Sequence, residues 1–90
     1  MASESELEAA LAHAQAVKSK YEAELLRKAN VVGVGVGFKS EGGKATDRVA
    51  IVVSVRKKVR RAALAPEDVI PPVLEGVPVD VVETGVLRAL

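Results

Sequence analysis

Glycine and valine alternate through residues 30–38, which read NVVGVGVGF. This period of two predicts a β-strand, because successive side chains of a strand point to opposite faces. One face carries the apolar side chains Val32, Val34, Val36 and Phe38, and the other carries only Gly33, Gly35 and Gly37. A dinucleotide-binding loop would need glycine at the sixth position of G-x-G-x-x-G and a helix after it. Phe38 occupies that position, so we expect a strand with one face that carries no side chains.

A hairpin and a second strand are expected next. Residues 40–44 read SEGGK, and Gly42 and Gly43 can adopt the positive φ angles of a tight turn. Residues 47–55 alternate again, with Val49, Ile51, Val53 and Val55 on one face and Arg48, Ala50, Val52, Ser54 and Arg56 on the other. Pairing the two valine faces sets the register of the hairpin.

Residues 3–29 contain no glycine or proline and predict one long helix. Ser3 or Ser5 can cap its first turn, and Arg27 and Lys28 favour its carboxyl end. Steps of three and four place Leu7, Leu11, Ala14, Tyr21 and Leu25 on one apolar stripe. A second row of small side chains lies round the side of the helix and consists of Ala9, Ala12, Ala16 and Ala23.

Residues 62–75 hold three of the four prolines and predict an irregular connection with a short helical turn. Residues 76–84, GVPVDVVET, then alternate as a third strand. Pro78 lacks an amide proton, which favours an edge position for this strand, or at least for the side of it that Pro78 faces.

Together these elements predict a single α+β domain over residues 1–90. The long helix of residues 3–29 packs on the valine face of a small three-stranded sheet within residues 30–85, and residues 86–90 form a tail. The order is helix, strand, strand, connection with a short helical turn, strand. Nothing left in the chain covers the glycine-bearing face of the sheet, so this face is a candidate contact surface.

Composition narrows the classes of function. Hydrophobic residues make up 49 % of the chain but aromatic residues only 2 %, and there is no cysteine. The lack of cysteine excludes disulfides and thiolate metal sites and fits a cytoplasmic protein. No apolar run is long enough to span a bilayer, and Glu4, Glu6 and Glu8 stand where a signal peptide would be basic.

Charge is distributed unevenly along the chain. Residues 39–61 hold eight basic and two acidic side chains, a net +6, whereas residues 62–90 hold one basic and five acidic, a net −4. The basic run consists of Arg56, Lys57, Lys58, Arg60 and Arg61. Such a run can contact nucleic-acid phosphates or pair with the acidic groups of a neighbouring copy.

Catalysis is not expected. His13 is the only histidine and has no partner at the i, i+4 spacing of a helical metal pair. A Ser-His-Asp triad would need His13, a serine such as Ser40 or Ser54, and an acidic residue to orient the histidine. Nothing in the sequence places such a third residue. We therefore expect no catalytic residue, no metal and no cofactor.

Several motifs resemble a known leader domain. These are the N-V-x-G-V-G-x-G strand, a second strand ending in basic residues, L-A-P-E-D-V-I-P and G-V-P-V-D-V-V-E, in this order through residues 30–85. This series resembles the leader that precedes trypsin-like peptidase domains in bacterial proteins. The resemblance implies the leader's fold but no protease activity, because the peptidase domain is not part of these 90 residues.

We therefore expect a non-enzymatic domain that self-associates into an oligomer or polymer. Candidate interface residues are Ala9, Ala12, Ala16, Ala23, Gly33, Gly35, Gly37, Ala50 and Val52. One alternative is an accessory or regulatory module of a trypsin-like peptidase system, with a peptidase or another protein domain as its partner. The other is nucleic-acid binding through the basic run.

Overall fold

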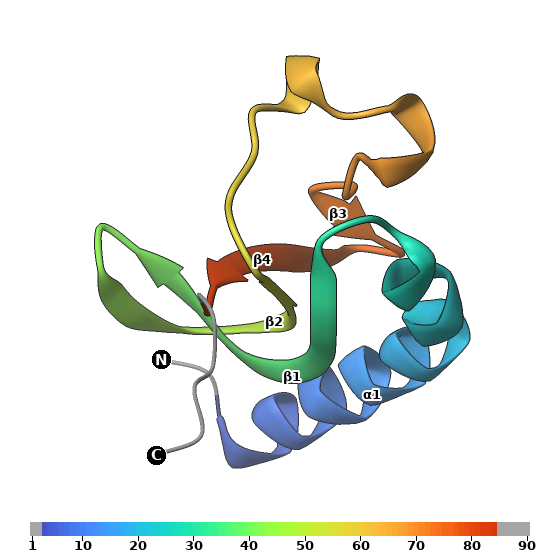
Figure 1. The fold of residues 1–90 in the computed structure, drawn as a ribbon. Coiled ribbons are helices and arrows are strands. Elements are labelled where there is room, and N and C mark those ends of the chain that lie inside the picture. Colours follow the sequence, from blue (N-terminus) through green and yellow to red (C-terminus); the bar gives the residue numbers. More distant parts are fainter. Residues whose placement is uncertain (1–2, 85–90) are drawn as a thin grey trace, which may run out of the picture.

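The computed structural model describes residues 3–84 and shows one helix packed on a four-stranded mixed sheet (Figure 1). The elements in chain order are α1 (Glu4–Arg27), β1 (Val31–Glu41), β2 (Lys44–Val55), two 3-10 turns η1 (Arg61–Ala63) and η2 (Pro66–Asp68), β3 (Val73–Leu74) and β4 (Val77–Glu83). The α+β class is confirmed, but the sheet has four strands rather than three. The predicted tail at residues 86–90 lies outside the described residues.

The additional strand, β3, comes from the proline-rich connection. Val73 and Leu74 pair antiparallel with Pro78 and Val77, across a two-residue turn. Glu75 and Gly76 form this turn with φ angles of 46° and 80°. Positive φ at both central residues is the geometry that a tight hairpin prefers. A strand of only two residues is too short to produce a period-two signal, which explains why the alternation pattern missed it.

The strand order is β1-β2-β4-β3, so β4 lies between two neighbours. β4 runs parallel to β2, from the pair Ile51–Val79 to the pair Val55–Glu83. The strand as a whole is therefore not at an edge, but Pro78 has β3 on one side and no paired strand on the other, as the alternative of a single free side predicts. Pro78 is accommodated because it lies at the beginning of the strand, before the pairing with β2 starts.

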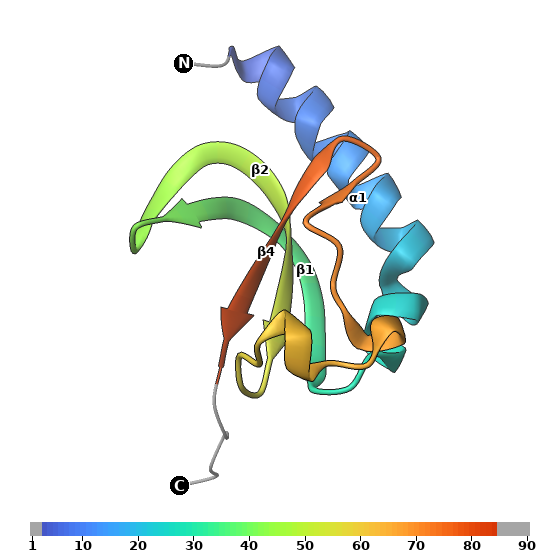
Figure 2. The ribbon, with the colours of Figure 1, turned by 90° about the horizontal axis from the view of Figure 1, so that it is seen from above.

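The helix begins and ends where its sequence indicates. Ser3 is the N-cap, and its hydroxyl accepts the amide of Glu6 at 3.2 Å. Ala14, Val17 and Leu25 are the buried residues of α1, all beyond its first two turns. Figure 2 shows that the amino-terminal turns project past the sheet. The packed part of α1 therefore covers the sheet with its middle and carboxyl-terminal turns.

The core lies between α1 and the valine face of the sheet. It consists of Ala14, Val17, Leu25, Ile51, Val53, Val55, Val77 and Val79. Val34 and Val36 pack against it and lie opposite Val53 and Ile51 in the register that the valine faces predict. The buried part of this layer is therefore aliphatic, and Tyr21 packs against it from α1 as a partly buried ring.

Two valine-face predictions fail at the ends of β1. The register shifts between Val31 and Gly33, so Val32 is an extra residue and is 48 % exposed, while Val31 packs against the core. A β-bulge of this kind moves one side chain out of the alternation. Phe38 is 44 % exposed because a second register shift follows it directly.

Candidate interaction surface

The glycine face lies on the side of the sheet away from α1. We define it as Gly33, Gly35 and Gly37 of β1, Val52 and Ser54 of β2, and Asp80 and Val82 of β4. Two cross-strand rows build it: Ser54 lies between Gly33 and Val82, and Val52 lies between Gly35 and Asp80. Because β1 is an edge strand, the glycine end of both rows borders the free edge of the sheet. Within residues 3–84, no helix covers this face (Figure 1).

The three glycines differ in what a side chain would meet. A Cβ atom at Gly37 would lie 3.2 Å from Cγ2 of Val52, so packing within the chain favours glycine there. A Cβ atom at Gly33 would make an ordinary contact of 3.7 Å with Cβ of Ser54. At Gly35, a Cβ atom would meet nothing within 4 Å. The fold of one chain therefore accounts for Gly37 but not for Gly35, whose φ is not positive either.

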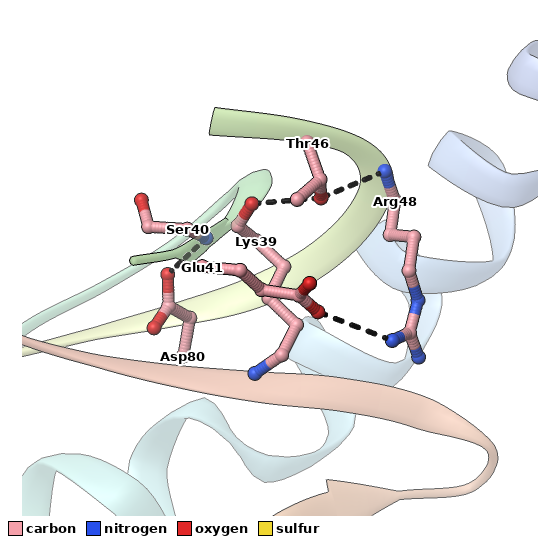
Figure 3. Close-up of polar contacts among 6 residues, drawn as sticks. All are labelled: Lys39, Ser40, Glu41, Thr46, Arg48 and Asp80. Atoms are coloured by element: carbon pink, nitrogen blue, oxygen red, sulfur yellow. Dashed lines mark hydrogen bonds and ion pairs between the residues drawn. The ribbon is translucent and has the colours of Figure 1, made fainter. Parts of the chain in front are cut away.

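The β1–β2 hairpin bends toward β4 on this same face (Figure 2). Although β2 separates β1 from β4, the carboxylate Oδ2 of Asp80 accepts the amide of Ser40 at 2.9 Å (Figure 3). Asp80 shares the glycine face with Val52, so this contact requires the end of the hairpin to fold over that face. Ala50, a candidate interface residue opposite Gly37, is fully buried within the chain and cannot contact a partner.

Thr46 stabilises the irregular part of the hairpin. Phe38 pairs with Val49 but Ser40 pairs with Ala45, so β2 has two more residues than β1 between these pairs. The Thr46 hydroxyl donates to the carbonyl of Lys39 at 2.8 Å and accepts the amide of Arg48 at 3.2 Å (Figure 3). It thereby satisfies backbone groups that the interrupted ladder leaves unpaired.

Sequence reasoning assigned no role to Thr46 or Asp80. For Asp80, the sequence did contain a signal: a single carboxylate within a valine-rich strand. A charge there costs free energy unless it has a hydrogen-bonding partner.

The alanine row of α1 lies on the opposite side of the molecule. At 100° per residue, Ala9, Ala12, Ala16 and Ala23 point about 170° away from the direction of the buried stripe. All four are exposed. The structure therefore does not bring the two groups of candidate interface residues together: one lies on the outer side of the helix and the other on the outer side of the sheet.

The basic run follows β2, and hydrogen bonds from its own backbone amides hold it in place. The amides of Lys57 and Lys58 donate to Asn30 Oδ1 at 3.1 Å and to Glu83 Oε1 at 2.8 Å. The side chains of residues 56–60 are exposed, and nothing is described for the side chain of Arg61. The acidic side chain of Glu83 thus lies next to this run, which lowers its capacity to attract polyanions.

Glu75 connects the β3–β4 turn to the helix. Its carboxylate pairs with the Lys20 ammonium at 2.8 Å, and its backbone carbonyl accepts Nε2–H of His13 at 3.0 Å. Hydrogen bonding from Lys20, and secondly from the Tyr21 hydroxyl, lowers the pKa of Glu75 below its ordinary value. The same contact with Glu75 raises the pKa of Lys20 and of Tyr21. The contact that His13 makes is therefore a structural one, between α1 and the β3–β4 turn.

Residues 3–84 contain neither a candidate metal site nor a candidate membrane-spanning helix. Within that range, no group of three or more histidine, cysteine, aspartate or glutamate side chains is placed to hold a metal ion. None of the helices described is long and apolar enough to cross a membrane.

Comparison with models of known protein families shows which family the chain belongs to. The model of the NARROW LEAF 1 N-terminal domain matches residues 10–86. The chain belongs to this family. The expected membership of a bacterial leader family is therefore wrong, because the match is to a family named for a plant protein. The accessory role beside a peptidase depended on that resemblance and is not carried further. No curated protein matches the chain.

Proposed function

We propose that this chain is a non-enzymatic domain that self-associates through its glycine face, with a second copy of the chain as its partner. Gly35 is the observation that carries the proposal. Glycine weakens a strand interior, and it commonly marks a place where another backbone approaches closely. Within residues 3–84, no atom beyond the neighbours of Gly35 in the chain lies within 4 Å of a Cβ at this position, so packing inside the described domain does not require glycine, and close approach by another chain would.

The chemistry of the face supports a protein partner. Val82 is 36 % exposed, and Val52 and Ser54 are partly exposed beside the glycines. Asp80 is the charged member of the face, and its carboxylate already accepts the Ser40 amide. The face is thus mostly apolar and offers little to a polyanion or a small polar substrate. A self-complementary patch of this kind suits an isologous contact across a two-fold axis.

The size of the face sets the expected affinity. The face covers five residues of β1 and three residues each of β2 and β4, which span about 14 Å across the strands and about 10–16 Å along them, or roughly 140–220 Å². Stable complexes bury roughly 800 Å² per partner. The interface is therefore expected to include the free edge of β1 and to dissociate in the micromolar range.

The alanine row offers a second surface on the opposite side. If both surfaces bound other copies, each copy would have a neighbour on either side and the assembly would grow into a polymer. If only the glycine face bound, the assembly would stop at a dimer. Alanine is also the best helix former, which suffices to explain it at exposed helix positions. We therefore assign the first contact to the sheet.

Sedimentation velocity over the micromolar range tests the assignment. The wild-type chain is expected to sediment increasingly faster than a 9.4 kDa monomer as its concentration rises. Gly35→Val is expected to abolish this increase without lowering the unfolding midpoint, because the monomer has space for the side chain and valine favours strands. Ala16→Arg, on the exposed side of α1, is the matched control and should associate normally.

Two other results would reject the proposal. One is a wild-type chain that remains a monomer at every concentration. The other is association that survives Gly35→Val and is lost in Ala16→Arg, which would move the interface to the helix.

The proposal places the domain in the cytoplasm, in keeping with its lack of cysteine. Nucleic-acid binding is the competing function, favoured by the exposed side chains of residues 56–60. It predicts a complex in a low-salt gel-shift assay that weakens steeply with added salt and is lost when Arg60 and Arg61 are neutralised. The nearby Glu83 and Asp68 make this the weaker candidate.

A further inference from the structure

The connection from β2 to β4 borders a cavity, open to solvent on one side, that the proposed self-association does not use. β2 and β4 are the parallel pair of the sheet, and the connection between them passes over their carboxyl ends (Figures 1 and 2). The cavity there has a volume of about 250 Å³. In sheets with parallel strands, ligands commonly bind outside the carboxyl ends of the strands.

The lining of this cavity is mainly aliphatic. Its apolar side chains come from the strand ends and from the connection, and they are Val55, Val59, Leu64, Val69, Ile70 and Val81. Val59 is 43 % exposed, so part of this apolar surface is in contact with water. A water molecule occupies about 30 Å³ in the liquid, so the cavity has room for about eight groups of that size. This corresponds to a short aliphatic chain.

The polar lining has a net positive charge. Lys57 and Lys58, whose side chains are exposed, belong to the lining together with the acidic residue Asp68. The Glu83 carboxylate lies just outside it, where it accepts the Lys58 amide. Among residues 3–84, no ion pair engages either of these lysines. The Asp68 carboxylate instead accepts the amide of Ala29 at 2.9 Å, and Asn30 is engaged with the backbone of Lys57. The ammonium groups are therefore available to an anion whose apolar part enters the cavity.

We propose that this cavity binds an aliphatic monocarboxylate of about six to eight carbons. The chain would contact the six apolar side chains, and the carboxylate would contact Lys57 and Lys58. Removal of the chain from water supplies most of the affinity, and the charge contact selects anions over cations. For a ligand of this size we expect a dissociation constant of about 1 mM or lower at low salt.

Octanoate and octylammonium are matched probes, because they share a chain and differ in the charge of the head group. In ¹H–¹⁵N NMR titrations, octanoate is expected to shift the amides of Asn30, Val59, Val69 and Ile70. Its affinity should exceed that of octylammonium at least fivefold. Butyrate should bind at least tenfold more weakly than octanoate, because its chain fills less of the cavity.

Two variants test the assignment of roles. The double variant Lys57→Gln and Lys58→Gln should weaken octanoate binding about tenfold and leave the unfolding midpoint unchanged, because both side chains are exposed. Leu64→Trp should occupy the cavity and prevent octanoate binding. Leu64→Met, of similar volume to leucine, is its control and should bind octanoate as the wild type does.

Three outcomes would overturn the proposal. The first is the absence of shifts at the cavity amides with several millimolar octanoate. The second is octylammonium binding as tightly as octanoate. The third is shifts confined to residues 56–60 and equal for butyrate and octanoate, which would indicate nonspecific anion contact at the surface. Monomeric behaviour in sedimentation would reject the self-association proposal but leave this one intact, so the two fail separately.

Discussion

The side-chain amide of Asn30 pairs with both backbone groups of Lys57. Asn30 Oδ1 accepts the Lys57 amide at 3.1 Å, and Nδ2 donates to the Lys57 carbonyl. Asn30 has a φ of 76°, a conformation that asparagine tolerates better than most residues. This pairing joins the beginning of β1 to the end of β2, at the point where the connection toward β4 leaves the sheet.

Replacement of Asn30 should therefore affect stability in two separable ways. Asn30→Ala loses two hydrogen bonds and places a Cβ in the left-handed region without local compensation, at a total cost of about 2–3 kcal/mol. Asn30→Gly loses the same bonds but not the conformational preference, and should be less destabilising by about 1 kcal/mol. Urea denaturation measures both. Equal losses would show that the backbone conformation of residue 30 contributes nothing.

The Asp80–Ser40 hydrogen bond should hold the bent hairpin against β4. Asp80→Ala removes the acceptor and is expected to destabilise the chain by about 1–2 kcal/mol, less than a fully buried charged bond because Ser40 is exposed. Asp80→Asn keeps an acceptor and should lose about half as much. Hydrogen exchange at the Ser40 amide should accelerate in Asp80→Ala. Unchanged exchange there would mean that Asp80 does not hold the bend.

Gly37 and Gly35 should respond oppositely to a side chain. Gly37→Val brings a Cβ to 3.2 Å from Cγ2 of Val52 and should destabilise the monomer by about 1–2 kcal/mol. Gly35→Val should be neutral or stabilising, because the space around it is open. Adding Val52→Ala to Gly37→Val should restore part of the loss. A Gly37→Val chain as stable as the wild type would contradict the contact with Val52.

Glu75 should make stability depend on pH under acidic conditions. Lys20 and then Tyr21 hold the pKa of Glu75 below its ordinary value of 4.5. The contribution of Glu75 is therefore fully present above pH 4.5 and disappears as pH falls through the lowered pKa. Unfolding midpoints of the wild type and of Glu75→Gln should differ at pH 6 and converge only once the pH falls below the lowered pKa of Glu75. A constant difference across this range would exclude titration of Glu75 as the cause.

The sequence predicted the elements that have a regular residue pattern and missed the features that have none. The period of two gave β1, β2 and β4, and the lack of glycine and proline gave α1. Val32 was placed on the wrong face because a one-residue bulge leaves no trace in an alternating pattern of valine and glycine. Parallel pairing of β2 with β4 was equally invisible, since side-chain alternation is the same for both strand directions.

The candidate surface was predictable only in part. The face without side chains followed from the glycines themselves, but neither the burial of Ala50 nor the bend that Asp80 holds through the Ser40 amide did. The distinction between Gly35 and Gly37 also depends on the position of one methyl group of Val52. Such differences arise from packing in three dimensions and have no counterpart in spacing along the chain.

Cysteine cross-linking tests the central claim most directly, because the chain has no cysteine of its own. Ser54→Cys places one thiol on the glycine face, and Ala16→Cys places one on the exposed side of α1. With a short bis-maleimide at micromolar protein concentration, the Ser54→Cys chain should form a covalent dimer rapidly, and the additional substitution Gly35→Val should prevent it. Cross-linking of Ser54→Cys that is no faster than that of Ala16→Cys would contradict self-association through the glycine face.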